Sequence, residues 1–407
     1  MKNVFTIILV LISMGLYSQT LEEYFKLAAE NNPGLLSQYK EFEAVLQKVP
    51  QVSTLPDPSL SFGYFVSPVE TRVGPQKARF SLTQMFPWFG TLKAQGDAAA
   101  LMAEAKYQSF LDAKNKLYYE VSAAYFPLYE LQEWMKIEER NIEILESYKT
   151  ISNSKFKNGV GTLVDVLRVD IFLKESQTNL EILKKKERPL LTTFNKLLNR
   201  GEFEPVSISE TLEIDMLSFD NGKDSLLVDH PLLNSLELKV KAVEASERAA
   251  IKQGFPKIGL GLDYVMVDKR TDMVVPDNGK DVLMPMVTLS LPIFRKKYKA
   301  AVKEAQLMQE SYSLQKTDMT NSLLSNYEMA FFDIEQQTEL VSLFDEQITE
   351  SEQALNLLFT SYGNSGKDFE EVLRMQQQLL KYDKLKITAL KQYKIALAKL
   401  NYITAKK

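Results

Sequence analysis

Large apolar side chains alternate with small or polar ones in several short segments of the chain, with the period of two that is typical of β-strands. The apolar positions are Phe80, Leu82 and Phe86, then Ile258, Leu260, Leu262, Tyr264 and Met266, then Val287, Leu289 and Leu291. The positions between them are Arg79, Ser81 and Thr83, then Gly259, Gly261 and Asp263, then Thr288 and Ser290, with Gln84 interrupting the first apolar face. Together with a strand expected directly after Pro58, these three segments predict two strands in each half of the chain. Residues 67–76 and 268–281 are rich in Pro, Gly and charge, which predicts exposed loops between the paired strands.

Two long segments, residues 89–155 and 294–360, are rich in Ala, Glu, Lys, Leu and Gln and nearly free of Gly and Pro. They predict helices of about 65 residues, which reach roughly 100 Å at 1.5 Å per residue. Pro127 interrupts the first segment, so we expect a kink there or a division into two helices. Return helices are predicted at residues 162–199 and 368–405.

The two return helices carry apolar residues at coiled-coil spacing. These positions are Val166, Leu173 and Leu180 with Val169, Leu183 and Leu190 in the first helix, and Val372, Leu379, Met375 and Tyr382 in the second. The spacing is held for only two or three heptads. It therefore predicts helices packed side by side rather than an extended dimeric zipper.

The N-terminus has the pattern of a secretory signal peptide at residues 1–19. Lys2 precedes an apolar run at residues 4–17, which ends in small and polar residues. At about 14 residues the run is shorter than the roughly 18 that a transmembrane helix needs, which favours a cleaved signal over a permanent anchor. No later apolar stretch is long enough to span a bilayer as a helix, so any membrane-spanning part must consist of strands.

Three landmarks recur in the same order about 200 residues apart, which is the signature of a duplicated unit. They are residues 32–36 against 230–233, residues 86–89 against 291–294, and residues 156–168 against 362–374. The division is a first repeat at 20–200 (helix, two strands and a long helical hairpin), a connector at 201–229 and a second repeat at 230–407. The connector contains Pro205, Gly222 and scattered acids and is expected to hold a short helix or strand of its own.

The chain has 407 residues, of which 49 are basic and 53 acidic, giving a formal net charge of −4. Both signs are spread along the sequence without a basic patch, which excludes nucleic acid as a partner. Cysteine is absent, which removes disulfides, thiolate metal sites, cysteine nucleophiles and the usual lipid attachment point. Stability must therefore come from packing and assembly.

Four strands are too few to close a membrane barrel, because known barrels begin at about eight strands. An open sheet edge in lipid would leave backbone groups unpaired, so we expect copies of the chain to share one barrel. Two copies would give eight strands and three would give twelve, and a helical tube around a lumen favours the larger number. The strands of a soluble sandwich alternate in the same way, so that alternative stays open.

The chain after residue 19 resembles the TolC family of outer-membrane efflux proteins over nearly its whole length. The resemblance rests on the duplicated architecture and on Leu55-Pro56-Asp57-Pro58, Gln84-Met85-Phe86-Pro87, and the two turns that contain Asp165-Val166-Leu167 and Glu371-Val372-Leu373. The first motif, followed by residues 59–63, is similar to members that serve heavy-metal efflux systems.

The resemblance implies a mainly α fold with a small β part. Long antiparallel helical hairpins would form an α-barrel, and four transmembrane strands per chain would form a twelve-stranded β-barrel in a homotrimer. The protein would lie in the outer membrane of a Gram-negative bacterium, surrounded by its lipid, with the helical barrel in the periplasm. The implied partners are a periplasmic adaptor (membrane fusion) protein and an inner-membrane pump of the RND type. No cofactor is implied.

The turns between the long helices and the return helices should form the periplasmic tip, and the resemblance implies that this tip meets the adaptor. The residues assigned to docking are Gly159, Val160, Gly161 and Thr162 in the first turn and Gly363, Asn364, Ser365, Gly366 and Lys367 in the second. Their glycines allow left-handed conformations and close backbone approach.

A gate is expected just beyond these turns, in a region that relatives use to constrict the channel. The residues assigned to it are Asp165, Arg168, Glu370, Glu371 and Arg374. Threefold symmetry would turn one acid per chain into a ring, and acid–Arg pairs between helices would hold the tip closed. Acids in a first helical turn also suit the helix dipole, which is the simpler explanation.

His230 is the only histidine and precedes Pro231 at a helix start. We interpret it as a capping or turn residue, because one His without clustered partners does not form a metal site. The 14 Met residues form no evident cluster in the sequence and are interpreted as packing. The sequence lacks a nucleophile elbow and a P-loop, so we expect no catalysis and no energy supply by this chain.

These observations predict a passive export duct, with heavy-metal ions as the favoured cargo. Drugs, or proteins secreted by a type I system, are alternatives within the same architecture. An exported structural helical stalk is a further alternative.

Overall fold

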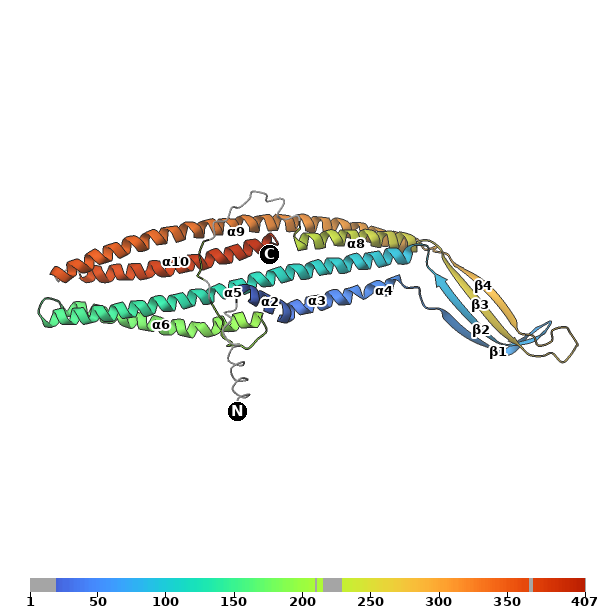
Figure 1. Ribbon diagram of the computed structural model, residues 1–407. Coiled ribbons are helices and arrows are strands. Elements are labelled where there is room, and N and C mark those ends of the chain that lie inside the picture. The colour runs from blue at the N-terminus through green and yellow to red at the C-terminus, as the bar shows by residue number, and fades with distance from the viewer. Residues whose placement is uncertain (1–19, 209–210, 215–228, 366–368, 407) are drawn as a thin grey trace, which may run out of the picture. The chain divides into compact units, whose positions relative to one another are not determined.

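The computed structural model describes residues 20–208, 211–214, 229–365 and 369–406. This part of the chain consists mainly of long helices and contains one four-stranded sheet (Figure 1). The prediction of a mainly α fold with a small β part is confirmed. None of the helices in these ranges is long and apolar enough to cross a membrane. The predicted signal segment lies outside the described residues. The described part of the predicted connector, 201–208, 211–214 and 229, contains neither a helix nor a strand.

The chain forms two compact units, and each is assembled from segments that lie far apart in the sequence. The helical unit takes its described residues from Met1–Ser37, Leu111–His230 and Thr320–Lys407. The strand unit takes its residues from Gln38–Phe110 and Pro231–Met319. Early and late parts of the sequence therefore fold together in both units.

The sheet of the strand unit consists of β1 (Ser59–Thr71), β2 (Gly74–Phe86), β3 (Lys257–Val267) and β4 (Val282–Ser290). The strands lie in the order β1-β2-β3-β4, and each neighbouring pair is antiparallel. β2 and β3 pair although they are far apart in sequence, with Leu82 opposite Leu262. This pairing joins the two early and the two late strands in one sheet.

One of the two predicted loops is wrong. Residues 67–76 belong largely to strands, because β1 continues to Thr71 and β2 begins at Gly74. The Thr71 hydroxyl donates to the Gly74 carbonyl at 2.6 Å, and Gly74 adopts a φ of 133°. Pro and charged residues suggested a loop here, but both are tolerated where a strand lies at the edge of a sheet. The other predicted loop, 268–281, is confirmed, since no strand lies between β3 and β4.

Short helices lead into the strands. They are α2 (Leu21–Asn31), α3 (Pro33–Leu46) and α4 (Lys48–Ser53) before β1, and α8 (Pro231–Gln253) before β3. The Thr20 side chain caps α2 by accepting a hydrogen bond from the Glu23 amide at 3.4 Å. Asn32 separates α2 from α3, and its side-chain oxygen accepts from the Leu35 amide at 3.0 Å.

Four long helices begin and end within five residues of the predicted bounds: α5 (Thr91–Lys157), α6 (Leu163–Leu197), α9 (Lys296–Ser365) and α10 (Phe369–Ile403). Of the two outcomes expected at Pro127, a kink or a division, the division is wrong, because α5 continues through this residue. Phe126 and Leu128 on either side are buried. Their packing offsets the backbone hydrogen bond that a proline cannot make.

The return helices bury the side chains that the coiled-coil spacing indicated. Val166, Leu173 and Leu180 are all buried in the helical unit. A core cluster close to the α5–α6 turn contains Leu145, Tyr148, Val169, Leu173, Tyr362, Phe369, Val372 and Leu373. Side-by-side packing of long and return helices, as predicted, therefore stabilises this end of the helical unit.

Candidate functional site

The α5–α6 turn is tight, and two glycines shape it. The Lys155 carbonyl accepts hydrogen bonds from the amides of Val160 at 3.0 Å and Gly161 at 3.1 Å, which ends α5. Gly159 adopts the left-handed conformation, with φ of 73°. A Cβ at Gly161 would lie 3.0 Å from the Lys155 Cβ. The prediction that this turn needs left-handed backbone and close approach is therefore confirmed for its two glycines.

Thr162 and Asp165 form a reciprocal cap at the start of α6. The Thr162 hydroxyl oxygen accepts from the Asp165 amide at 3.2 Å, and the Asp165 carboxylate accepts from the Thr162 amide at 3.2 Å. The Thr162 hydroxyl also donates to that carboxylate, at 2.8 Å. Asp165 thus satisfies backbone donors that the first turn of a helix leaves free. Its carboxylate has a structural use in addition to any role in a gate.

The prediction of a turn at residues 363–367 is wrong for residues 363–365. Gly363, Asn364 and Ser365 belong to α9, which runs on to Ser365. Gly363 has no left-handed φ, and a Cβ added to it would meet nothing within 4 Å. Neither reason that favoured glycine applies at this position. Gly366 and Lys367, also assigned to docking, lie outside the described residues.

The structure brings two of the five residues assigned to the gate together across helices. Arg168 of α6 lies with its Nη1 2.7 Å from the Glu370 Oε2 of α10. Glu371 and Arg374 pair with each other one turn apart on α10 instead. One acid–Arg pair between helices is therefore present beside the turn, as the prediction of ion pairing requires.

The sequence interpretation missed a contact between Lys155 and Tyr362 in the same region. The Lys155 ammonium donates to the carbonyls of Tyr362 at 2.5 Å and Gly363 at 3.2 Å, and lies 4.2 Å from the centre of the Tyr362 ring. Tyr362 is buried and stacks on Phe369 at 4.4 Å. Burial raises the pKa of the Tyr362 hydroxyl, and the Asp165 charge adds to this rise. A Lys in the last turn of α5 indicated that its ammonium could cap backbone carbonyls. It did not indicate that those carbonyls would belong to α9.

The sheet exposes a nearly continuous apolar face. Phe62 lies beside Phe80, with ring centres 5.0 Å apart, and Leu60 lies opposite Leu82 two register rows further along, on the same face. The exposed apolar members of this face are Leu60, Phe62, Tyr64, Phe80, Leu82, Ile258, Leu260, Leu262, Tyr264, Met266, Leu283, Val287 and Leu289. Exposure of such a face to water raises the free energy of the protein unless something apolar covers it.

The opposite face of the sheet is mixed: it has Ser, Thr and Gly beside Val265, Val282 and three methionines, and it contains a buried charge. Ser61, Ser81 and Asp263 lie in one register row across β1, β2 and β3. The Arg79 guanidinium donates to Asp263, whose side chain is fully buried. An apolar face opposite a wet one is the pattern of strands between lipid and an aqueous interior.

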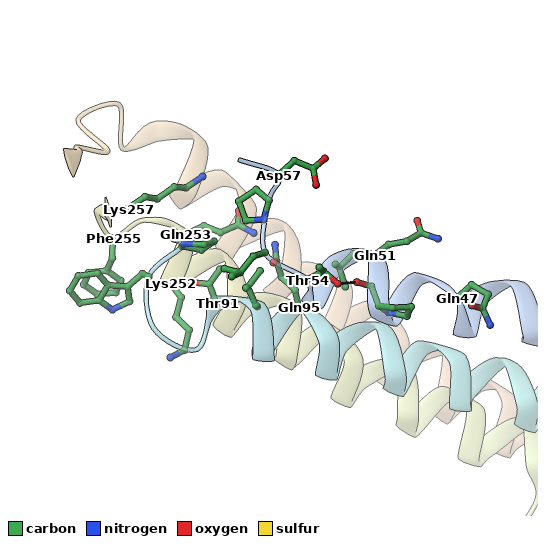
Figure 2. Close-up of a pocket in the computed structure, with 17 residues that line it drawn as sticks. Gln47, Gln51, Thr54, Asp57, Thr91, Gln95, Lys252, Gln253, Phe255 and Lys257 are labelled. Atoms are coloured by element: carbon green, nitrogen blue, oxygen red, sulfur yellow. Dashed lines mark hydrogen bonds between the residues drawn. The ribbon is translucent and has the colours of Figure 1, made fainter. Parts of the chain in front are cut away.

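Where the strands meet the helices of the strand unit, a cavity of about 900 Å³ opens (Figure 2). Glutamines and threonines line much of it, and the Trp88 ring stacks on Phe255 at 5.2 Å. Figure 2 shows the Asp57 carboxylate and the Lys252 ammonium pointing in different directions.

His230 immediately precedes α8 and is buried in the helical unit, with its ring 6.3 Å from that of Tyr402. Burial lowers the pKa of His230 to about 4. Across the described ranges, no group of three or more His, Cys, Asp or Glu side chains is placed to hold a metal ion.

Solved structures match the chain over nearly its whole length. The outer membrane protein VceC of Vibrio cholerae is 15% identical, with 94% of this chain and 95% of that chain covered and a TM-score of 0.74. CusC, described for its folding and transmembrane channel formation, is 13% identical over 96% and 95%, with a TM-score of 0.78. The open-state MtrE outer membrane channel of Neisseria gonorrhoeae is 18% identical over 94% and 88%, with a TM-score of 0.73.

No protein-family model and no curated protein sequence matches the chain. The structural likeness shows the fold, which this chain shares with these outer-membrane proteins. CusC and MtrE are both described as channels.

Proposed function

We propose that this protein is a TolC-family outer-membrane channel and serves as the passive export duct of a tripartite efflux system. One observation carries the proposal: a single chain combines long helical hairpins with a four-stranded sheet whose exposed face is apolar. A soluble sandwich would cover that face with a second sheet. The described residues form a single sheet, so lipid is the covering that the proposal assigns.

The assembly in this proposal is a homotrimer with a twelve-stranded β-barrel. Within the described chain β1 and β4 each have one strand neighbour, so each leaves an unpaired edge. Edges in lipid must be paired, and pairing β1 of one copy with β4 of the next would close a ring. The helical hairpins of the three copies would form the α-barrel in the periplasm.

The two halves of the sequence, 20–200 and 230–407, would be copies of one ancestral unit joined by the connector 201–229. Corresponding helices have similar lengths, which supports this: α6 and α10 have 35 residues each, and α5 and α9 have 67 and 70. Each copy would supply one strand pair and one helical hairpin to the trimer.

The α5–α6 turn is the surface proposed to dock the periplasmic adaptor, which would connect the duct to an inner-membrane RND pump. Val160, Leu163, Val164 and Leu167 are each more than half exposed there, although all are apolar. Apolar side chains left in water beside a rigid turn suit a protein interface. The Arg168–Glu370 pair is the proposed restraint on opening.

Heavy-metal ions are the proposed cargo, on the strength of Leu55-Pro56-Asp57-Pro58 and the strand that follows it. Multidrug efflux and type I protein secretion use the same architecture and are the alternatives. The energy would come from the pump.

A deletion strain tests both levels of the proposal. We expect the strain to become sensitive to graded copper, silver, cobalt, zinc or cadmium, and to recover with the intact gene. Sensitivity to dyes, detergents and antibiotics alone would reject the metal cargo and retain the duct. The duct itself would be rejected if the protein made in cells did not reach the outer membrane, or if the purified protein did not conduct ions in planar bilayers.

A further inference from the structure

Basic residues without acids gather at the end of the sheet where strands join helices. Residues 84–96, 248–262 and 291–303 form the corners between β2 and α5, α8 and β3, and β4 and α9. Together they hold nine basic residues and no Asp or Glu: Lys93, Arg248, Lys252, Lys257, Arg295, Lys296, Lys297, Lys299 and Lys303. The concentration is not evident along the sequence, because the first and last corners are about 200 residues apart.

The other end of the sheet has balanced and partly paired charges. Residues 67–76 and 268–281 hold four basic and five acidic residues, and Arg270 pairs there with Asp272. The nine cations at the helix end form no ion pair within the described residues, because the ion pairs of the strand unit involve other cations. Their charge is therefore uncompensated within one chain, which distinguishes the two ends of the sheet.

Side-chain contacts join the three corners. The Lys252 ammonium of α8 donates to the Phe89 carbonyl, before α5, at 3.2 Å. The Arg295 guanidinium, before α9, lies 3.5 Å from the Gly254 carbonyl oxygen. The end of α8 and the start of α9 therefore lie together. We call their five cations the basic corner: half-buried Lys252 and exposed Arg295, Lys296, Lys297 and Lys299.

Exposed apolar side chains adjoin the basic corner. Phe89, Ile293 and Phe294 are 77%, 72% and 78% exposed. Phe89 carries the carbonyl that Lys252 binds, and Phe294 directly precedes Arg295. Aromatic side chains mark the boundary between lipid and water in membrane barrels, and clustered cations beside a membrane attract anionic headgroups. The basic corner combines both features at one level of the molecule.

Helix stability does not explain the cations at the start of α9. Acids suit a helix N-terminus, yet the first turn of α9 contains none. Arg295, Lys296, Lys297 and Lys299 are instead four like charges within five residues, and they repel one another. A negatively charged partner would relieve this repulsion.

We infer that the basic corner binds the phosphate groups of anionic glycerophospholipids in the leaflet on the periplasmic side of the membrane. A membrane surface presents many phosphates, so cations that lie at one level bind it without converging on one point. Lysine side chains also keep their apolar stems against the lipid while the ammonium reaches the headgroups. The inference rests on the proposed function, because it requires the strands to lie in lipid and the helices in the periplasm.

The test is native mass spectrometry of the purified protein in detergent, titrated with dioleoyl phosphatidylglycerol or dioleoyl phosphatidylcholine. The two lipids share their acyl chains and differ in headgroup charge. We expect the wild type to bind phosphatidylglycerol more tightly, and Lys296→Gln/Lys297→Gln/Lys299→Gln to lose at least about tenfold of this affinity, since each cation near an anionic surface contributes about fivefold. The variant should keep the wild-type melting temperature in lipid-free detergent, because these exposed side chains form no ion pair.

Two further variants separate charge at the basic corner from other effects. Lys296→Arg/Lys297→Arg/Lys299→Arg keeps the charge and should bind phosphatidylglycerol as the wild type does. The matched control, Lys184→Gln/Lys185→Gln/Lys186→Gln, removes three exposed cations from α6 in the helical unit and should also bind as the wild type does.

The outcomes separate the lipid-binding surface from the proposed function. Equal affinity of the wild type for the two lipids, unchanged phosphatidylglycerol affinity in the Gln variant of the basic corner, or an equal loss in the α6 control overturns the inference. A protein that conducts ions in planar bilayers but shows no preference for phosphatidylglycerol rejects the surface and leaves the duct in place. A protein that does not conduct, yet binds phosphatidylglycerol through the basic corner, supports the surface and rejects the duct.

Discussion

At the residue scale, the Arg168–Glu370 pair gives the proposed gate a specific test. The two side chains are 39% and 66% exposed, and an exposed pair contributes only about 0–1 kcal/mol to stability. Arg168→Glu should therefore leave the fold intact but replace attraction between α6 and α10 by repulsion. We expect a higher conductance in planar bilayers, and a return toward the wild-type value in Arg168→Glu/Glu370→Arg.

The matched control for this pair is Arg374→Glu. Arg374 pairs with Glu371 on the same helix, so its reversal changes the charge near the turn without breaking a contact between helices. If Arg374→Glu raises conductance as much as Arg168→Glu, the effect belongs to general charge and the pair is not a restraint.

His230 gives a second prediction at the residue scale, concerning pH. Its pKa is about 4 in the folded protein and 6.5 ordinarily. Below pH 6.5 the unfolded chain takes up a proton that the buried ring does not, so stability falls until the pH reaches about 4. The pKa difference corresponds to about 3 kcal/mol. His230→Phe keeps a ring beside Tyr402 and should lose less stability between pH 7.5 and 4.5 than the wild type.

The measurement for His230 is the apparent melting temperature in detergent at both pH values. Carboxylates titrate in both proteins. The difference between the two falls in melting temperature from pH 7.5 to 4.5 therefore measures the contribution of the histidine. Equal drops in wild type and His230→Phe would show that the ring becomes protonated in the folded state.

At the element scale, two glycines assigned to similar turns should respond oppositely to alanine. Gly159 has a φ of 73°, where a Cβ costs roughly 1–2 kcal/mol, so Gly159→Ala should lower the melting temperature. Gly363 lies in α9 with open space around it, so Gly363→Ala should be neutral or stabilise by up to about 1 kcal/mol. Thermal unfolding of the two variants side by side measures the difference. A loss of stability in Gly363→Ala similar to that in Gly159→Ala would contradict the helical assignment of residue 363.

The elements also show what the sequence could and could not predict. Helix bounds followed from composition, and the Thr162 cap that the structure shows is a further local signal, because it lies within a few residues of the helix end. The continuity of α5 through Pro127 depends on tertiary packing, which no local signal reports. The Lys155–Tyr362 contact joins residues 207 positions apart, and the pairing of β2 with β3 joins strands from opposite halves of the chain. Contacts of this kind require the fold before they can be recognised.

At the scale of the whole molecule, the proposed trimer requires lipid on one face of the sheet and water on the other. Leu82 and Ser81 are neighbours on β2 that lie on opposite faces, and Leu82 is 49% exposed. An Arg on a lipid-facing strand costs about 2–4 kcal/mol near the bilayer midplane, whereas an Arg facing the interior alters selectivity with little effect on stability. Leu82→Arg should therefore reduce the amount of trimer that reaches the outer membrane, and Ser81→Arg should not.

Semi-native electrophoresis of outer-membrane fractions measures trimer for both variants, and planar bilayers measure conductance for Ser81→Arg. The added positive charge beside Asp263 should change the ion selectivity of the assembled channel, because Ser81 lies opposite Asp263 in the register. If both variants yielded soluble monomer like the wild type, the apolar face would be covered by protein rather than lipid. The sheet would then belong to an exported helical stalk, since a duct cannot form without a closed barrel.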